Sequence, residues 1–335
     1  MRSGILASGN WIIDQVKVID NYPDEEQLAN VLNEYSSNGG SAYNILKGLV
    51  KLNAPFPLSG LGLVGDDERG KSIISECEQL NIDTTQLRTT SSSHTSYTDV
   101  MSVQKTGKRT FFHQRGANAF LDISHFNFET TKAKIFHLGY LLLLDKLDII
   151  GSDGNTGAAL VLKKAKEAGL ITSADLVSER SDRFKTIIPC ALPFVDYLFV
   201  NEFEADMLSG IQTTNANGEV VIDQCNAAAS IILDMGVREA VILHFPAGAI
   251  ALNKKGNQIF QPSINVLPAD IKGAVGAGDA FAAGVLVGIH ENWLMEDCLK
   301  MGVCAAASSL FDVTSSEGIL PSNDCLLLSK KYGYR

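Results

Sequence analysis

The chain has 335 residues and a mass of 36.0 kDa, enough for one large α/β domain with a small appendage. A net charge of −10 and a pI near 5.1 disfavour nucleic acid and anionic membranes as partners, although a local cluster of amides or arginines can still bind an anion. The six cysteines form no C-x-x-C pair, no apolar run reaches the ~18 residues of a membrane span, and no signal peptide is evident. We therefore expect a cytoplasmic protein with free thiols.

Strand-like and helix-like segments alternate along most of the chain. Short apolar runs favour strands, and longer runs with one apolar face favour helices. In chain order we predict a strand at 5–7, a helix at 41–52, a strand at 57–64, a helix at 71–80, a strand at 134–138, a helix at 157–168, strands at 170–173 and 197–200, helices at 202–208 and 224–235, a strand at 240–244, and helices at 279–289 and 298–310. Repeated strand–helix units with short links indicate a largely parallel sheet covered by helices on both faces.

Two stretches interrupt this alternation. Residues 11–20 and 31–38 alternate like half-exposed strands, and residues 95–104 and 109–114 flank a turn and predict a hairpin. Antiparallel strands inserted into a parallel α/β protein indicate a small β-sheet lid, with its strands at about 11–38 and 95–114. The alternative is that these strands extend the main sheet. Because no linker divides the chain, we predict a single domain over residues 1–335.

A turn of small residues near the C-terminal end leads directly into an apolar helix. Gly276, Ala277 and Gly278 have almost no side chain to shield their backbone N–H groups, and Asp279 begins the helical segment. Free amides at a helix N-terminus, beside the positive end of the helix dipole, form a site for an anion such as phosphate. Asp279 could contact whatever attacks that phosphate. The structural alternative is a tight turn with Asp as a capping residue.

Two better-known glycine motifs fit less well. A dinucleotide-binding fingerprint would need a glycine where Phe281 stands. Residues 65–72 (GDDERGKS) match the Walker A pattern, but Asp66, Asp67 and Glu68 would place three carboxylates beside a triphosphate. We therefore interpret the Walker match as a coincidence.

Three further sites combine small and polar residues. Asp14 places a carboxylate on an expected lid strand. Gly39 and Gly40 would let the backbone approach a ligand, with Asn44 in the first turns of the next helix. Residues 201–204 (NEFE) directly follow an expected strand, where open parallel sheets bind ligands. An Asp and an Asn suit neighbouring sugar hydroxyls, because the first accepts and the second both accepts and donates. Singly, each also fits a structural role as a turn or capping residue.

Together and in this order, these segments resemble the ribokinase (PfkB) family of carbohydrate and nucleoside kinases. The resemblance runs almost from end to end and covers the stretch from Gly9 to Asp14, Gly39–Gly40 with Asn44, Gly65 to Gly70, Gly107 to Phe111, Gly116 to Ala119, Asn201 with Glu204, and Gly276 to Asp279. It implies a three-layer αβα fold with a mostly parallel central sheet and a small β lid. It also implies an enzyme that uses ATP and Mg²⁺ to phosphorylate a hydroxymethyl group.

The resemblance also implies roles for the sites described above. Residues 276–278 would hold the transferring phosphoryl group, and Asp279 would orient the sugar hydroxyl and accept its proton. Asn201 and Glu204 would order Mg²⁺ and its waters beside the phosphates, with Glu204 as the metal-associated carboxylate. Asp14, together with the Gly39–Gly40 turn and Asn44, would contact the sugar.

Three departures from the family pattern affect the nucleotide side of this expected site. Residues 273–275 are Gly-Ala-Val where the family often has Asp-Thr-Thr, which weighs against the monovalent-cation site of some members. The family loop Thr-x-Gly-x-x-Gly appears here as residues 243–248 (LHFPAG), in which Gly248 is retained and Phe245 replaces the first glycine. We expect His244 and Gly248 at a reshaped adenine pocket. Residues 175–180 match the family pattern too weakly to be given a role.

The sequence does not identify the substrate. An ATP-dependent sugar kinase similar to fructokinase or ribokinase is the leading hypothesis, and a nucleoside kinase of the same fold is the runner-up. A non-catalytic sugar-binding regulatory protein is disfavoured by the intact Asp279, and a P-loop NTPase is the weakest alternative. Arg109, like His113 and Arg115, could contact a phosphate or carboxylate on the substrate, or be a solvated charge on an edge strand. The exposed lid hairpin is a natural place for pairing between subunits, so we expect a homodimer.

Overall fold

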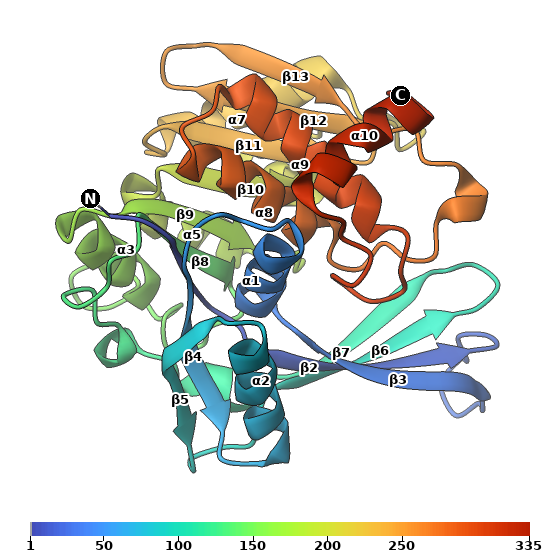
Figure 1. Ribbon diagram of the computed structural model, residues 1–335, viewed down its shortest axis with the longest axis horizontal. Coiled ribbons are helices and arrows are strands. Elements are labelled where there is room, and N and C mark those ends of the chain that lie inside the picture. Colours follow the sequence, from blue (N-terminus) through green and yellow to red (C-terminus); the bar gives the residue numbers. More distant parts are fainter. Residues whose placement is uncertain (1) are drawn as a thin grey trace.

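A nine-stranded sheet forms the centre of the structure, a computed structural model that describes residues 2–335 (Figure 1). Its strands, in spatial order, are β13 (Gln258–Pro262), β12 (Gly248–Asn253), β11 (Ala240–Phe245), β10 (Tyr197–Asn201), β9 (Ile171–Leu176), β8 (Ile135–Leu141), β1 (Ile5–Ser8), β4 (Leu58–Gly65) and β5 (Asp83–Thr90). The seven strands from β11 to β5 pair in parallel, whereas β12 and β13 are added antiparallel at one edge. The predicted mostly parallel sheet is therefore confirmed.

Helices cover both faces of this sheet. They are α1 (Ser41–Lys51), α2 (Glu68–Gln79), α3 (Gly157–Glu167), α4 (Arg183–Thr186), α5 (Ile188–Ala191), α6 (Glu202–Ser209), α7 (Ile222–Asp234), α8 (Ala277–His290), α9 (Met295–Ser309) and α10 (Ser322–Tyr332). One buried apolar cluster joins the sheet to α1, α2, α8, α9 and α10, and a second joins it to α3, α5, α6 and α7. The two clusters give the predicted three-layer αβα architecture.

The start of a helix is set by a local capping residue in several places. Asp67 accepts a hydrogen bond from the Gly70 amide, which explains why α2 begins three residues before the helix predicted at 71–80. Asn201 and Glu204 form a reciprocal capping box at the start of α6. These two caps fix where α2 and α6 begin, and so position the polar residues at these two junctions.

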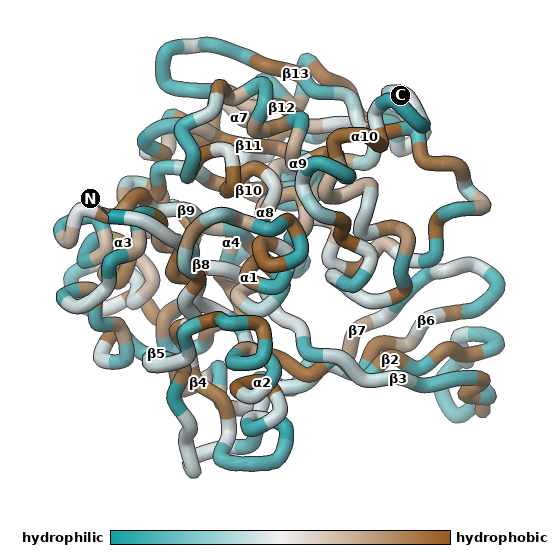
Figure 2. The backbone as a smooth tube through the Cα atoms, viewed as in Figure 1, coloured by the Kyte–Doolittle hydropathy of each residue, from teal (hydrophilic) through white to brown (hydrophobic). Residues whose placement is uncertain are grey.

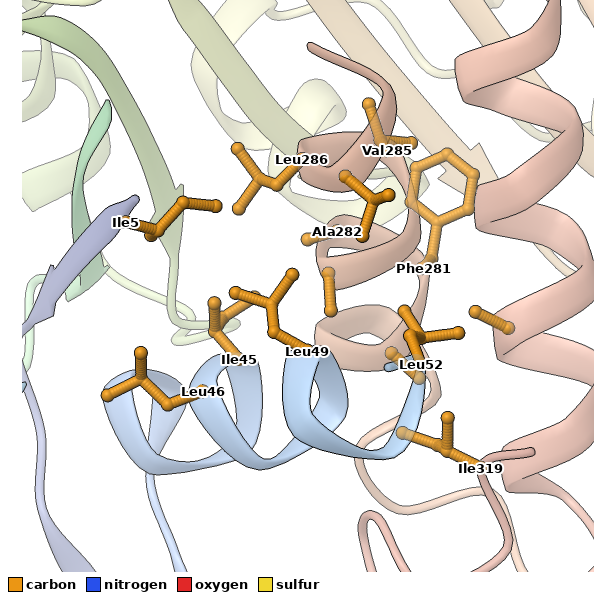
Figure 3. Close-up of a cluster of buried hydrophobic side chains, with 14 of the residues drawn as sticks. Ile5, Ile45, Leu46, Leu49, Leu52, Phe281, Ala282, Val285, Leu286 and Ile319 are labelled. Carbon is orange, nitrogen blue, oxygen red and sulfur yellow. The ribbon is translucent and has the colours of Figure 1, made fainter. Parts of the chain in front are cut away.

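The helix α8 is the most deeply buried one, and it packs against α1 (Figure 3). Ile45 and Leu49 of α1 point toward Ala282 and Leu286 of α8. Gly48 allows a close approach, because a Cβ there would lie 3.1 Å from the Cβ of Ala283. This contact holds the N-terminal ends of α1 and α8 next to each other.

A second, four-stranded sheet projects from the main domain beneath the C-terminal helices (Figure 1). Its order is β3 (Val31–Gly39), β2 (Ile12–Ile19), β6 (Tyr97–Val103) and β7 (Arg109–Gln114). The predicted hairpin β6–β7 is antiparallel, and so is the pair β2–β3, but the two inner strands β2 and β6 pair in parallel. The expectation of antiparallel lid strands does not hold for this inner pair, because β2 and β6 both leave the main sheet in the outward direction.

Six regular elements have no counterpart in the elements predicted in chain order: β5, α4, α5, β12, β13 and α10. Short 3₁₀ helices also occur at Gly116–Phe120, Ile123–His125, Leu192–Phe194 and Pro268–Asp270. No helix within residues 2–335 combines the length and the hydropathy needed to cross a bilayer.

Candidate active site

The strand order reverses direction next to β1, and this reversal creates a crevice at the carboxyl ends of the strands. The chain runs outward from β1 through β4 to β5, and then from β8 on the other side of β1 through to β11. Open α/β sheets bind ligands at such a switch point. A cavity of about 410 Å³ lies there, between the ends of these strands and the lid. A hollow of about 490 Å³, lined by Ser3, Asn81 and Lys132 among others, contains none of the predicted site residues.

Most of the predicted site residues line this cavity. They are Asp14, Gly40, Asn44, Asn201, Glu204, His244, Gly276, Ala277, Gly278 and Asp279. Three do not line it, namely Gly39, Arg109 and Gly248. Residues far apart in sequence are thus brought together by α1, α6, α8 and the first lid strand.

The N-terminus of α8 has the geometry expected for an anion site. Gly276 caps the helix in the left-handed conformation, with φ of 72°. A Cβ at Gly276 would lie 2.5 Å from the Ser315 carbonyl oxygen, so only glycine fits this turn. At Gly278 a Cβ would lie 3.1 Å from Cε1 of His244, whose ring covers this side of the loop. The first-turn amides of α8 therefore face the cavity without large side chains in front of them.

Asp279 is buried, and two donors hold its carboxylate. The Asn44 side-chain amide donates to Oδ2 at 2.8 Å, and the Tyr140 hydroxyl donates to the same oxygen at 2.9 Å. Burial and the neighbouring Asp175 raise the pKa of Asp279 to about 7, whereas the bonds from Asn44 and Tyr140 lower it. Because both donors use Oδ2, they leave Oδ1 free for another ligand.

Tyr140 and Asp175 were not predicted as site residues, yet Tyr140 donates to Asp279 and Asp175 holds the backbone of Tyr140 in place. Tyr140 follows Gly139 near the end of β8 with φ of 53°, a rare conformation for a bulky residue. Its amide donates to Asp175 Oδ1 at 2.5 Å, and the Ser41 hydroxyl donates to Asp175 Oδ2 at 2.7 Å. The position of Asp175 at the end of β9 was the available clue, since polar residues at strand ends face the crevice.

Asp14 projects from β2 at the lid side of the cavity. A Cβ at Gly39 would lie 2.1 Å from Asp14 Oδ2, so the glycine on the paired strand makes room for this carboxylate. Burial raises the pKa of Asp14 to about 6, with no hydrogen bond from residues 2–335 to offset it. The carboxylate is thus a free acceptor, and Gly39 acts through Asp14 rather than by lining the cavity.

The lid also contributes alternate residues of β6 and β7. Thr98, Phe111 and His113 line the cavity, and the Thr98 hydroxyl lies 2.9 Å from His113 Nδ1. His113 Nε2 is buried without a hydrogen-bond partner within the described chain. Arg109 is on the same face of β7 as His113 but at the far end of the strand, next to Tyr35, so it does not reach the cavity.

Glu204 lies in the first turn of α6 and also lines the cavity. Its carboxylate accepts hydrogen bonds from the Asn201 amide, the Asn201 side chain and the Ser178 hydroxyl. Burial raises its pKa to about 8, because none of its neighbours in residues 2–335 is a cation that would stabilise the charge. A carboxylate in this setting favours a nearby cation. No group of three or more His, Cys, Asp or Glu side chains in residues 2–335 could hold a metal ion by itself.

A second cavity, of about 450 Å³, adjoins the first. It is largely apolar and is lined by Phe203, Phe245, Phe281 and Gly248 among others. His244 lines both cavities, and its ring packs against Phe281 with centroids 5.2 Å apart. Gly248, predicted at the nucleotide, thus lies in the second cavity, and His244 separates the two.

The Walker-like segment serves a structural purpose. Asp67 caps α2 and also accepts hydrogen bonds from the amide and the hydroxyl of Thr95. Lys71 is exposed and pairs with Glu68 on the helix surface. Amides and carboxylates of the loop are therefore paired with its own residues and with Thr95, and Lys71 lines neither of the two cavities.

Comparison with known proteins identifies similar chains. Residues 5–322 match the sequence model described as pfkB family carbohydrate kinase. A ribokinase of Haemophilus influenzae is 23% identical over 312 residues, which cover 92% of this chain and 93% of the relative. A 5-dehydro-2-deoxygluconokinase of Clostridium perfringens is 24% identical over 292 residues, which cover 83% of this chain and 80% of the relative. The structure of Arabidopsis thaliana ribokinase complexed with ribose and ATP superposes with a TM-score of 0.79 at 22% identity, over 98% and 99% of the two chains.

Proposed function

This chain belongs to the pfkB family of carbohydrate kinases, phosphotransferases that act on alcohol groups, and we propose that it transfers the γ-phosphoryl group of ATP to a hydroxymethyl group of a sugar. One observation carries the proposal. Asp279 lies in the first turn of α8, beside the Gly276–Gly278 amides, in the same cavity as the free carboxylate of Asp14.

Asp279 acts as the base in this proposal. Its free Oδ1 accepts the proton of the sugar hydroxyl while the α8 amides stabilise the charge on the transferring phosphoryl group. Phosphoryl transfer requires mainly positioning and charge stabilisation, and preorganised amides supply both. Asn44 and Tyr140 position the carboxylate, and Asp14 and Asn44 position the sugar.

The nucleotide spans both cavities in this arrangement. Its adenine lies in the apolar cavity beside Gly248 and Phe281, and its phosphates pass His244 toward the α8 amides. Mg²⁺ fits the buried, cation-free carboxylate of Glu204, which with Asn201 would hold the ion through water. When bound, the ion would neutralise charge on the phosphates.

A monovalent-cation site does not fit this chain. Ala274 and Val275 offer no side-chain oxygen, and a Cβ at Gly273 would lie 2.8 Å from the Asp312 carbonyl oxygen. The loop around residues 312–315 thus packs directly where a carboxylate side chain would extend.

The experiment that tests the function is an ADP-release assay with Mg-ATP and a panel of sugars and nucleosides. We expect phosphorylation of at least one sugar and slow ATP hydrolysis without it, since a closed lid excludes water. A nucleoside as the best acceptor would favour the nucleoside-kinase alternative. Binding of sugars without turnover would favour a regulatory protein.

Replacing Tyr140 by phenylalanine is expected to shift the pH profile of kcat. Asp279 must be ionised to act as a base, so activity falls as the pH falls through its pKa, which is about 7 in the free protein. The Tyr140 hydroxyl lowers that pKa, and its removal therefore moves the acid limb to higher pH. We expect kcat at pH 7 to fall about three- to tenfold and to recover largely by about pH 9.

The matched control for this variant is Tyr197→Phe. Tyr197 begins β10, at the end of the sheet away from the cavity, so the same chemical change there leaves the profile unchanged. A Tyr140→Phe profile that coincides with the wild-type profile would remove Tyr140 from the site.

Asp14→Ala is expected to weaken sugar use while leaving nucleotide affinity almost unchanged. Removing an acceptor that pairs with a buried hydroxyl costs ~1–3 kcal/mol, which corresponds to a roughly ten- to hundredfold lower kcat/KM for the sugar. Asn44→Ala is expected to act in the same direction, and the two effects are non-additive if one sugar bridges both residues. Asp24→Ala, on the exposed loop between β2 and β3, is the control. Unaltered sugar kinetics in Asp14→Ala would contradict the assignment.

We also propose that the protein forms a homodimer through the lid and acts in the cytoplasm. Hydrophobic segments occur along the lid strands (Figure 2). The lid exposes apolar side chains at Val31, Leu32 and Phe112, each about half exposed, which favour burial against a second copy. The six cysteines are all free thiols, in keeping with a reducing compartment. We expect a light-scattering mass of two chains at micromolar concentration, and a mass of one chain would reject the dimer.

A further inference from the structure

The acceptor end of the cavity combines several carboxylates with no cationic side chain. Asp14, Asp175 and Asp279 line the cavity, whereas none of its lining residues is a lysine or arginine. Asp175 and Asp14 each raise the pKa of Asp279 by like-charge repulsion. The field at this end of the cavity is therefore already unfavourable to negative charge.

Arg109 lies on β7 outside the cavity lining, with its Nε unpartnered within residues 2–335. Two other arginines near the cavity, Arg115 and Arg183, are held by other partners. Arg115 donates to the Leu142 carbonyl oxygen and pairs with Asp145. Arg183 donates to the same carbonyl and pairs with Asp148 and Glu179. To reach a ligand, either arginine would have to leave carboxylates that it already contacts.

The remaining polar groups at the acceptor end suit hydroxyls. Asp14 offers an unpaired acceptor, and Thr98 offers a hydroxyl. His113 offers the unpartnered Nε2, and burial together with Arg115 lowers its pKa to about 4, so the imidazole is neutral at pH 7. Neutral groups and carboxylate acceptors pair well with sugar hydroxyls, but they leave an anionic group without a partner.

The phosphoryl end of the same cavity differs in this respect. There the α8 amides and the helix dipole face the ligand, and that end receives the phosphates of ATP in the proposed function. Asp14 lies on the lid strand β2, and like Asp175 it raises the pKa of Asp279 by like-charge repulsion. With the amides occupied by the phosphates of ATP, the charge of an anionic acceptor would lie against these carboxylates.

We infer that the acceptor is a neutral polyhydroxyl compound, neither phosphorylated nor a sugar acid. This inference rests on the proposed kinase function and narrows its substrate class. The inference excludes, for this chain, the activity that gives a 5-dehydro-2-deoxygluconokinase its name. The acceptor in that name is a sugar acid.

The test compares neutral and anionic acceptors that share a free primary hydroxyl. D-fructose is paired with D-fructose 6-phosphate, D-glucose is paired with D-gluconate, and D-ribose and 5-dehydro-2-deoxygluconate complete the panel. With Mg-ATP, we expect kcat/KM for the best neutral acceptor to exceed that for the best anionic acceptor by at least ~10²-fold. A higher kcat/KM for an anionic acceptor would overturn the inference and leave the kinase assignment intact. If no sugar in the panel is phosphorylated, the proposed function fails and the inference fails with it.

A variant that adds a positive charge to the cavity tests whether charge sets the preference for neutral acceptors. Phe111 lines the cavity and is 59% exposed, so Phe111→Arg can add a cation there without opening the core. Phe111→Gln removes the same ring without adding charge and is the matched control. We expect the arginine variant to raise kcat/KM for the anionic acceptors about tenfold relative to the glutamine variant, with no such gain for the neutral ones. Equal values for the two variants on every acceptor would show that charge does not set the preference.

Discussion

Asp279→Asn is expected to lower kcat by at least ~10²-fold while nucleotide binding is largely retained. Asparagine keeps the size of the side chain and can still contact Asn44 and Tyr140, but it cannot accept a proton from the sugar. The loss should persist at every pH, because the variant has no carboxylate to ionise. This behaviour distinguishes it from Tyr140→Phe, whose loss recovers at high pH.

The measurement combines steady-state kinetics with ATP binding and circular dichroism. Asp297→Asn is the matched control, since Asp297 also stands in the first turn of a helix, α9, but is exposed. Near-normal turnover of a folded Asp279→Asn protein would end the proposed role of Asp279 as the base.

Gly276→Ala is the second substitution with a large expected effect. The left-handed conformation costs a non-glycine residue about 1–2 kcal/mol, and the added methyl group would overlap the backbone of Ser315. The turn can relieve this overlap only by moving, which displaces the α8 amides from the phosphoryl group. Loss of one such donor typically costs ~10²–10³-fold in kcat, so we expect kcat/KM for ATP to fall by about 10²-fold or more.

Gly278→Ala provides the comparison for this prediction. The change is the same and lies two residues away, but the new methyl group meets the His244 ring rather than backbone. Because a side chain can shift by a few tenths of an ångström, we expect a loss of less than about tenfold. A larger loss at Gly278 than at Gly276, in proteins of equal thermal stability, would show that the turn is not what positions the amides.

Predicting the fold from sequence succeeded where burial dictates the residue pattern. The buried strands β1, β10 and β11 have apolar runs that identify them, and β8 has one interrupted by His137. The missed strand β5 lies at the sheet edge, and Leu87 is its only buried residue, so its polar sequence resembles a loop. The edge strand β13 likewise has no fully buried residue.

For the candidate site, the motifs located the residues on α1, α6 and α8 because short spacings are fixed within one turn and one helix. Long-range partners are different. The bond between Tyr140 and Asp279 joins two elements that only the folded sheet brings together, and nothing in the local sequence around Tyr140 indicates it. Arg109 was proposed from its charge, with a solvated position on an edge strand as the alternative. It lies on β7 outside the cavity lining, and its role as a substrate ligand stays a prediction.

The parallel pairing of β2 with β6 has a consequence for the order of folding. This pairing joins residues as distant in sequence as Ile13 and Tyr97, and the segment between them contains β3 together with α1, β4, α2 and β5. Closing so long a chain loop costs entropy before the strand pairing returns any stabilisation. The intervening segment must therefore bring its two ends together first. The hairpin β2–β3 emerges early during synthesis, but its neighbour in the lid becomes available only after the first third of the main domain has taken shape.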